Sequence, residues 1–196
     1  MIYLLRHGET VFNAAGRYQG ALDSPLTPRG QAQARALGRR LAARLGPAPH
    51  GFRLVASPLG RTRETARLVA LELGLDPARI EHDARLREVT LGAWDGLTRD
   101  EIDAGWPGAL DDAGPFEWFY RGPGGESFEQ AQARLADWLA EQRADRPVIA
   151  ISHGAVGRVL RGLYAGLARD ITVALDVPQD ALFHLADGHI ERIEVG

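Results

Sequence analysis

The sequence predicts an α/β fold, a three-layer αβα sandwich with a mostly parallel central sheet. Two observations predict it. Short apolar runs typical of buried strands, at residues 2–5 and 148–151, alternate with longer segments whose apolar residues recur at helical spacing. Strands that alternate with helices in this way favour a parallel sheet covered on both faces. The length of 196 residues suits a single domain spanning residues 1–196.

The first half of the chain is expected to hold two long helices. Thr27 followed by Pro28 is typical of a helix start, and helical spacing continues until Gly46 and Pro47. A second helix is expected after residue 58, closed by Gly74. The strands expected around these helices lie at residues 2–5, 52–56 and 79–81.

The second half is expected to begin with irregular structure. Glycine, proline and aromatic residues crowd residues 106–125, within a segment of about 97–126 that we expect to form a rim over a substrate. Ser127 then opens a helix expected to run to about Arg143. The elements expected beyond it are a strand at 148–151, a helix at 156–164, and two strands, 181–185 and 189–195, around the hairpin signal Asp187-Gly188.

The composition excludes several kinds of chemistry. There is no cysteine, which rules out disulfides and a thiolate nucleophile, and all 23 basic residues are arginine. Arginine is therefore the only cation able to hold a phosphate, through the paired N–H groups of its planar fork. A net charge of -3 favours neither a nucleic-acid nor a membrane partner. The N-terminal residues do not resemble a signal peptide, so a cytoplasmic location is expected.

Two histidines directly follow predicted strands. His7 and His153 are each followed by glycine, a residue that lets the chain turn sharply beside a ligand. Ligands of open α/β sheets bind at the carboxyl ends of the strands. A third such pair, His50-Gly51, lies among prolines and is interpreted as a loop. Taken alone, each histidine could equally be an ordinary hydrogen-bonded residue.

Arginines at two predicted strand exits favour the catalytic interpretation. Arg6 precedes His7, and Arg61 lies near the start of a helix expected to follow another strand. A helix N-terminus adds unpaired N–H groups and a positive dipole end. We expect these groups to converge at one sheet edge and to bind a multiply charged anion, for which phosphate is the first candidate.

Five sequence blocks, in this order, resemble the histidine phosphatase superfamily, whose members share the phosphoglycerate mutase-like fold. The resemblance spans nearly the whole chain. Within the superfamily, the chain is similar in particular to broad-specificity and α-ribazole phosphatases, which need no cofactor. The blocks that carry it are Leu5-Arg6-His7-Gly8-Glu9-Thr10 with Asn13 and 16–30; Ser57 to Ala66; Glu88 with Gly92, Trp94 and Gly96; Gly124-Gly125-Glu126-Ser127; and Ser152-His153-Gly154.

The resemblance implies a set of catalytic roles. His7 attacks phosphorus and carries the phosphoryl group, while Arg6, Arg61 and His153 neutralise the phosphoryl oxygens. Glu88 protonates the leaving alcohol and then deprotonates the incoming water. The residues implied in substrate or phosphate binding are Gly8, Asn13, Gln19, Gly20 and Gly154.

The chemistry is consistent with these roles. An alkoxide leaves phosphorus poorly, so an acid is needed beside it. A neutral imidazole is a good nucleophile, and a covalent intermediate splits one hard step into two. Glu88 has an alternative interpretation as a surface carboxylate paired with Arg85 or Arg87. One branch of the superfamily uses an aspartate directly after its second histidine, but this chain has Gly154 there, which favours Glu88.

The other candidates are given lesser roles. Arg17 and Arg63 are interpreted as solvated or supporting residues, and no role is assigned to His82, His184 or His189. No metal is expected, because the acidic residues show no ligand spacing with histidine. The aromatic residues that could form either core or the rim over the leaving group are Trp106, Phe116, Trp118, Phe119 and Tyr120.

Three functions remain open. A phosphatase releases the phosphoryl group to water, whereas a mutase returns it to a carboxylate-bearing substrate. Mutases of the family carry a longer insertion with adjacent arginines and a lysine, and a C-terminal tail over the site. This chain has no lysine, its only adjacent arginines are Arg39-Arg40, and it ends soon after its last strand, which favours a phosphatase acting on a small phosphomonoester. A non-catalytic phosphate-binding protein is the third alternative, and the oligomeric state stays open.

Overall fold

The computed structural model describes residues 1–47, 49–111, 113–114, 116–142 and 145–195. Within these ranges the strands form one mixed sheet of six, in the order β3-β2-β4-β1-β5-β6. The strands are β1 (Ile2–Arg6), β2 (Arg53–Ala56), β3 (Glu81–His82), β4 (Val148–Ser152), β5 (Ala181–Ala186) and β6 (His189–Glu194).

The larger part of the sheet is parallel, as the sequence predicts. β1 pairs with β4, β4 with β2, and β2 with β3, all in parallel. β5 and β6 are antiparallel and complete the sheet beside β1. The turn that joins them contains Asp187 at φ 51° and Gly188 at φ 76°. Two consecutive residues with positive φ are typical of the hairpin turn expected from this dipeptide.

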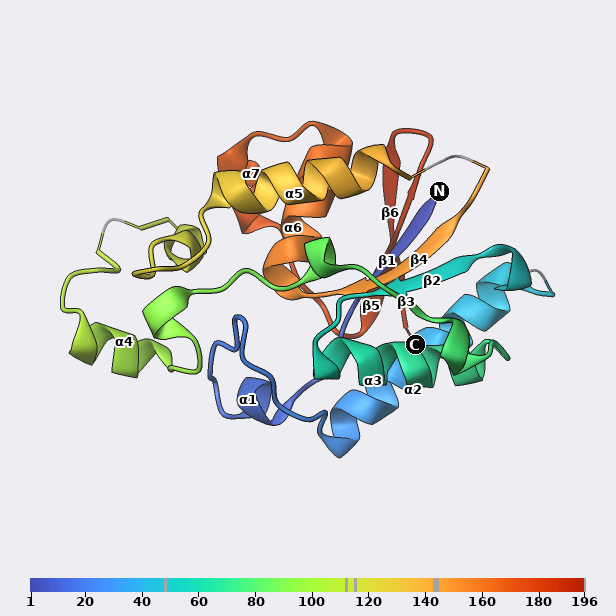
Figure 1. Ribbon diagram of the computed structural model, residues 1–196, viewed down its shortest axis with the longest axis horizontal. Coiled ribbons are helices and arrows are strands. Elements are labelled where there is room, and N and C mark those ends of the chain that lie inside the picture. Colours follow the sequence, from blue (N-terminus) through green and yellow to red (C-terminus); the bar gives the residue numbers. More distant parts are fainter. Residues whose placement is uncertain (48, 112, 115, 143–144, 196) are drawn as a thin grey trace.

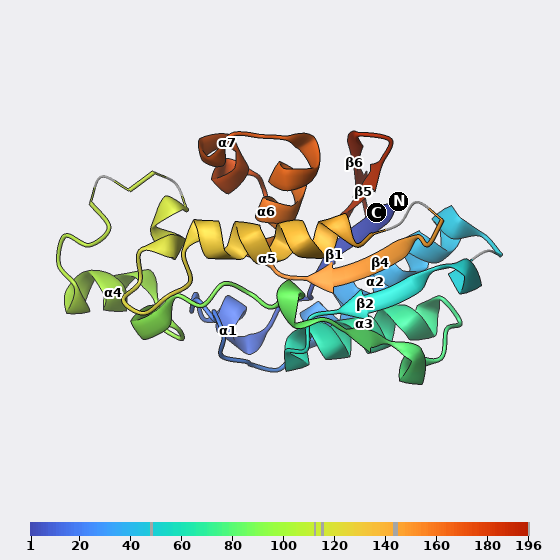
Figure 2. The same cartoon turned by 45° about the horizontal axis from the view of Figure 1, so that its top comes forward.

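Helices cover both faces of the sheet, which confirms the three-layer prediction. α2 and α3 lie on one face, and α5 and α6 on the other, with α7 beyond α6 (Figure 1; Figure 2). The helices are α1 (Val11–Ala14), α2 (Pro28–Leu45), α3 (Gly60–Glu72), α4 (Arg99–Gly105), α5 (Phe128–Ala140), α6 (Gly154–Ala165) and α7 (Arg169–Ala174).

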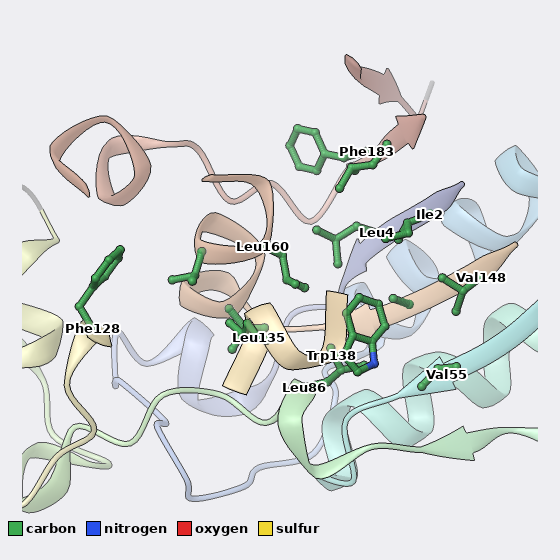
Figure 3. Close-up of a cluster of buried hydrophobic side chains, with 14 of the residues drawn as sticks. Ile2, Leu4, Val55, Leu86, Phe128, Leu135, Trp138, Val148, Leu160 and Phe183 are labelled. Carbon is green, nitrogen blue, oxygen red and sulfur yellow. The ribbon is translucent and has the colours of Figure 1, made fainter. Parts of the chain in front are cut away.

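The apolar strands are explained by burial on both faces. Side chains alternate between the faces of a strand. In β1, Ile2 and Leu4 join the cluster under α5 and α6, whereas Tyr3 and Leu5 join the cluster under α2 and α3. Figure 3 shows the first cluster, to which both Leu135 of α5 and the strand side chains belong. A strand covered on both sides therefore has no polar face, and its sequence is a continuous apolar run.

The long helices begin where the sequence places them. The side chain of Thr27 accepts a hydrogen bond from Gly30 N at the start of α2, and Ser127 caps α5 in the same way. α5 ends at Ala140, short of the expected end at about Arg143, which lies outside the described residues. The short helices α1, α4 and α7 were not predicted, although α4 begins with a capping box formed by Thr98 and Glu101.

The segment expected to form a rim lies at one end of the molecule, beyond α1 (Figure 1). It contains α4 and one 3-10 turn, Glu117–Tyr120, in agreement with the expected irregular structure. Ile102 and Trp118 of this segment are buried in a small cluster together with Trp94, which lies just before the segment. This cluster is separate from the two clusters that cover the faces of the sheet.

Candidate active site

The two histidines meet because their strands are neighbours in the sheet. β1 and β4 run parallel with Arg6 opposite Ser152, so the residues that follow leave from the same edge. The ring centroids of His7 and His153 are 5.2 Å apart, and both side chains are buried. The predicted convergence of the two strand exits is therefore observed.

A cavity of about 290 Å³ opens at this edge, and eight of the ten predicted site residues line it. His153 and Gly8 lie outside its lining. The predicted residues on the cavity are Arg6, His7, Asn13, Gln19, Gly20, Arg61, Glu88 and Gly154.

The protonation of His7 follows from its hydrogen bond. Its Nδ1 lies 2.8 Å from the carbonyl oxygen of Gly8. A carbonyl oxygen can only accept, so Nδ1 carries the proton and the neutral ring has a bare Nε2. Burial, followed by the positive charges of Arg6 and Arg61, holds the pKa of His7 well below its usual value. At neutral pH, His7 is therefore an uncharged imidazole with a free lone pair on Nε2.

Both buried histidines should make the protein less stable in mild acid. Burial is also the main cause that lowers the pKa of His153, so both rings stay neutral in the folded state while the unfolded chain takes up protons near pH 6.5. Their contribution to stability is complete above that pH and is lost as the pH falls below it, by up to about 1.4 kcal/mol per pH unit for each ring.

Urea unfolding at about pH 7.5 and about pH 5.5 measures this loss. His7→Gln should show a smaller loss between the two pH values than the wild type, because one of the two rings is gone. His189→Gln is the matched control, since His189 is exposed on β6. An equal loss in His7→Gln and the wild type would contradict the assignment of a neutral, buried His7.

Arg6 offers an unused donor to a ligand. One terminal amino group, Nη1, donates to the carbonyl oxygen of Val177 at 2.5 Å. Its Nε is buried and has no hydrogen-bond partner among the described residues. A buried donor left unpaired costs about 1–3 kcal/mol. An anion that accepts from this Nε would recover that cost.

Arg61 is held from several sides by the protein. Its Nε donates to His153 Nδ1 at 3.2 Å, and Nη2 donates to the carbonyl oxygen of Gly20 at 2.9 Å. Nη1 donates to Leu22 O and Asp23 Oδ1. A guanidinium has five N–H groups, so these four bonds leave one N–H on Nη2. The backbone N–H of Arg61 also donates to Asp23, which therefore occupies the start of α3 that we expected to help bind the anion.

His153 uses both of its ring nitrogens within the protein. Nδ1 accepts from Arg61 Nε, so Nε2 carries the proton and donates to Ser57 Oγ at 2.8 Å. In this arrangement the neutral ring of His153 orients Arg61. Contact between His153 and phosphoryl oxygens, which the resemblance implies, stays a prediction and would require the ring to give up one of these partners.

Glu88 is not a surface ion-pair residue. Arg85 pairs with Asp83 and Glu141 instead, and Arg87 donates to the carbonyl oxygen of Ala84. The carboxylate of Glu88 lines the cavity and accepts from the backbone N–H groups of Ala155 and Val156, each at 3.3 Å. The N-terminus of α6 thus holds the carboxylate at the cavity wall.

The predicted binding residues fall into two groups. Asn13 Oδ1 accepts from Thr10 N and Gln179 Nε2, and Gln19 Oε1 accepts from Ser24 Oγ. Among the described residues no acceptor contacts the NH₂ group of either amide, so each NH₂ group can donate to a ligand.

The glycines have structural reasons of their own. A Cβ on Gly20, at φ 51°, would lie 1.6 Å from Asp95 Oδ1. A Cβ on Gly8 would lie 2.1 Å from the carbonyl oxygen of Gly30, and Gly8 N already donates to Thr65. Gly154 is the first residue of α6 and has no such close neighbour. The phosphate-binding roles of these glycines stay predictions.

The aromatic residues divide between core and rim. Phe116 and Phe119 line the cavity, whereas Trp118 is buried in the small cluster of the rim and Trp106 packs against it. Tyr120 packs against the main cluster under α5 and α6. Some members of the aromatic segment are therefore core residues, whereas a rim over the leaving group, formed by Phe116 and Phe119, stays a prediction.

Sequence reasoning missed Arg158, which also lines the cavity. It lies four residues after Gly154 on α6, and residues at this spacing share one face of a helix. Gly154 and Ala155 line the cavity as well. The helical spacing from the predicted Gly154 is the signal that would have found it.

The predictions for Arg17 and His50 have simpler outcomes. Arg17 lines the cavity, but its guanidinium pairs with Glu101 through both terminal nitrogens. His50 lies in a single 3-10 turn between α2 and β2, as expected of a loop. In the described ranges no three acidic or histidine side chains form a group able to hold a metal ion. No helix within those ranges has the length and apolar character needed to cross a membrane.

A family model described as histidine phosphatase superfamily (branch 1) matches residues 2–186. The chain belongs to this superfamily. Over 162 residues, 78% of this chain and 69% of the relative, it is 41% identical to a protein of Enterobacter sp. (strain 638) named probable phosphoglycerate mutase GpmB. The match confirms the resemblance seen in the five sequence blocks, and the chain is an enzyme of the superfamily.

Two solved structures are similar to this chain over nearly its whole length. A mycobacterial glucosyl-3-phosphoglycerate phosphatase in complex with VO3 is 30% identical with a TM-score of 0.73, covering 93% of this chain and 90% of that chain. YhfR of Bacillus stearothermophilus is 30% identical with a TM-score of 0.78, covering 99% and 95%. Phosphatase and mutase names thus both occur among the relatives.

Proposed function

We propose that this enzyme hydrolyses phosphomonoesters through a phosphohistidine formed on His7, without a metal or cofactor. The observation that carries the proposal is the bare Nε2 of a neutral His7 on the same cavity as the unpaired Nε–H of Arg6. A nucleophile and a cationic donor with no protein partner are what an incoming phosphate dianion requires.

The reaction follows in two steps. In the first, His7 Nε2 attacks phosphorus, the ester P–O bond breaks, and protonated Glu88 gives its proton to the leaving oxygen. In the second, the carboxylate of Glu88 takes a proton from water as the water oxygen attacks phosphorus. The P–N bond then breaks, inorganic phosphate leaves, and both His7 and Glu88 return to their starting states.

The arginines stabilise charge that gathers on the phosphoryl oxygens. Arg6 contributes its Nε–H, and Arg61 contributes the one N–H that the protein leaves free. Both guanidinium groups are fixed by carbonyl oxygens before substrate arrives. Preorganised donors of this kind are each typically worth about 10²–10³ in rate.

A mutase is the second candidate, because the 41% identical relative bears a mutase name. One feature of this chain favours the phosphatase. Its adjacent arginines do not reach the cavity, where they could hold the carboxylate-bearing substrate of a mutase. The adjacent arginines Arg39-Arg40 lie on α2, where Arg39 pairs with Glu72 and Arg40 donates to the carbonyl oxygen of Glu194. Neither lines the cavity.

A fixed-time assay on 3-phosphoglycerate and a panel of other monoesters, with chelator present, tests the proposal. Release of inorganic phosphate at the rate of substrate loss is the expected result. Efficient conversion to 2-phosphoglycerate with little free phosphate would overturn it in favour of the mutase. Loss of activity in chelator would contradict the metal-free mechanism.

A further inference from the structure

Arg158 is a buried arginine that the mechanism does not use. Its side chain is 4% exposed and lines the cavity that holds His7. Its Nε donates to the carbonyl oxygen of Leu175 at 2.5 Å. In the described part of the chain its terminal amino groups have no hydrogen-bond acceptor, and no carboxylate forms an ion pair with it. Buried charges are ordinarily paired, so this one requires an explanation.

The next arginine on the same helix shows the ordinary case. Arg161 also lies on α6, is also 4% exposed, and also stacks on an aromatic ring, with its guanidinium carbon 3.9 Å from the centroid of Phe183. Its charge is matched by Asp176 at 3.0 Å. Arg158 has the stacking, on Phe116 at 3.8 Å, without the carboxylate. The difference between the two is that Arg158 lies on the cavity.

The contacts of Arg158 limit how a ligand can approach it. Phe116 covers the face of its guanidinium, and the Leu175 carbonyl occupies Nε. The two terminal amino groups remain, and they present parallel N–H groups in the plane of the fork. Burial lowers the pKa of Arg158 to about 10, so the group is still charged at neutral pH. A planar carboxylate is the anion that matches this edge through two hydrogen bonds.

The size of the cavity limits the rest of the ligand. Pockets for drug-sized ligands enclose about 300–1,000 Å³, and this cavity, at about 290 Å³, must also hold the phosphoryl group. The leaving group is therefore small, and a carboxylate fits more easily than a second phosphate.

We propose that Arg158 is a specificity residue that binds a carboxylate on the leaving group, so that the preferred substrates are small phosphomonoesters of hydroxy acids. This proposal rests on the proposed function, since it assigns the substrate class of the same site.

The experiment compares two probes that differ mainly at one end, 3-phosphoglycerate and glycerol 3-phosphate. Phosphate release gives kcat/KM for the wild type and for Arg158→Met, which keeps an apolar stem without the charge. Arg158→Lys keeps the charge without the planar fork. Arg161→Met is the matched control, because it removes a stacked, equally buried arginine from the same helix but not from the cavity.

The wild type should prefer 3-phosphoglycerate, and Arg158→Met should lower that preference by about 10- to 100-fold, the range for a charge-assisted pair. Arg158→Lys should restore part of it, and Arg161→Met should keep all of it. A wild type with no preference, or a preference that survives Arg158→Met, would overturn the proposal. Equal losses on both probes would overturn it as well, because they would show a purely structural role.

Calorimetry in a His7→Ala background separates the two proposals, since binding is then measured without turnover. His7→Ala should bind 3-phosphoglycerate more tightly than glycerol 3-phosphate, and the added Arg158→Met should abolish the difference. If the wild type releases phosphate from neither probe while this binding difference holds, the hydrolytic function fails and the carboxylate site stands. Equal affinities for the two probes would refute the carboxylate site even where both are hydrolysed.

Discussion

Replacing His7 with alanine should lower phosphate release at least ~10⁴-fold, because the covalent route then has no nucleophile. The ring is the only part of His7 that the chemistry uses, since its backbone N–H already donates to Ser152 in the sheet. Rapid quenching of the wild type during turnover should trap a phosphoryl group on protein that is stable in base and labile in acid. The same experiment on His7→Ala should trap none.

A histidine to which no role is assigned provides the control for this prediction. His189 is exposed on β6, and His189→Ala should keep both full turnover and the trapped adduct. Circular dichroism and unfolding in urea establish that His7→Ala is folded. Turnover within tenfold of the wild type in folded His7→Ala, or an adduct that remains after this substitution, would refute the phosphohistidine mechanism.

Replacing Glu88 with glutamine should lower kcat by about 10²–10⁴ on an alkyl phosphate, the range for a general acid or base. Glutamine keeps the size of the side chain and one oxygen that can accept from Ala155 N or Val156 N. The N-terminus of α6 should therefore keep its position. The loss on the first step should be much smaller for p-nitrophenyl phosphate, because its leaving group departs without a proton. A burst of p-nitrophenol followed by slow turnover is therefore expected.

Glu126 offers a matched control for Glu88. It is a partly buried carboxylate, but it pairs with Arg134 at 2.6 Å and does not line the cavity. Glu126→Gln should leave kcat close to the wild-type value on both substrates, since the carboxylate of Glu126 is paired with Arg134 and lies off the cavity. An equal loss on alkyl and aryl phosphates in Glu88→Gln, without a burst, would show that Glu88 does not protonate the leaving group.

The main elements of the fold could be predicted from local signals. Apolar runs of four or five residues mark strands covered on both faces, and Thr27 and Ser127 mark the helix starts that their side chains cap. The short helices were harder to predict. α1 has four residues, fewer than the pattern of a helical face needs, so its existence depends on the Thr10 cap and on tertiary contacts.

The sequence by itself determined which residues are the candidates for the proposed chemistry. His7 and His153 lie directly after apolar runs that predict strands. Ligands of α/β sheets bind where the strands end, so residues at two such ends are candidates for one site. The five sequence blocks added Glu88, Arg61 and the family. These signals lie within short stretches of the sequence, so they can be recognised without knowledge of the fold.

Only the tertiary structure decided how each of these residues is used. Which nitrogen of His7 is bare depends on the Gly8 carbonyl, and the use of both His153 nitrogens depends on Arg61 and Ser57, which come from another part of the chain. Among the residues that the structure describes, Arg161 has a carboxylate partner and Arg158 has none, and this difference depends on which side chains are neighbours in space. Charge and hydrogen bonding act over a few ångströms, and distances of that kind are fixed by packing rather than by position along the chain.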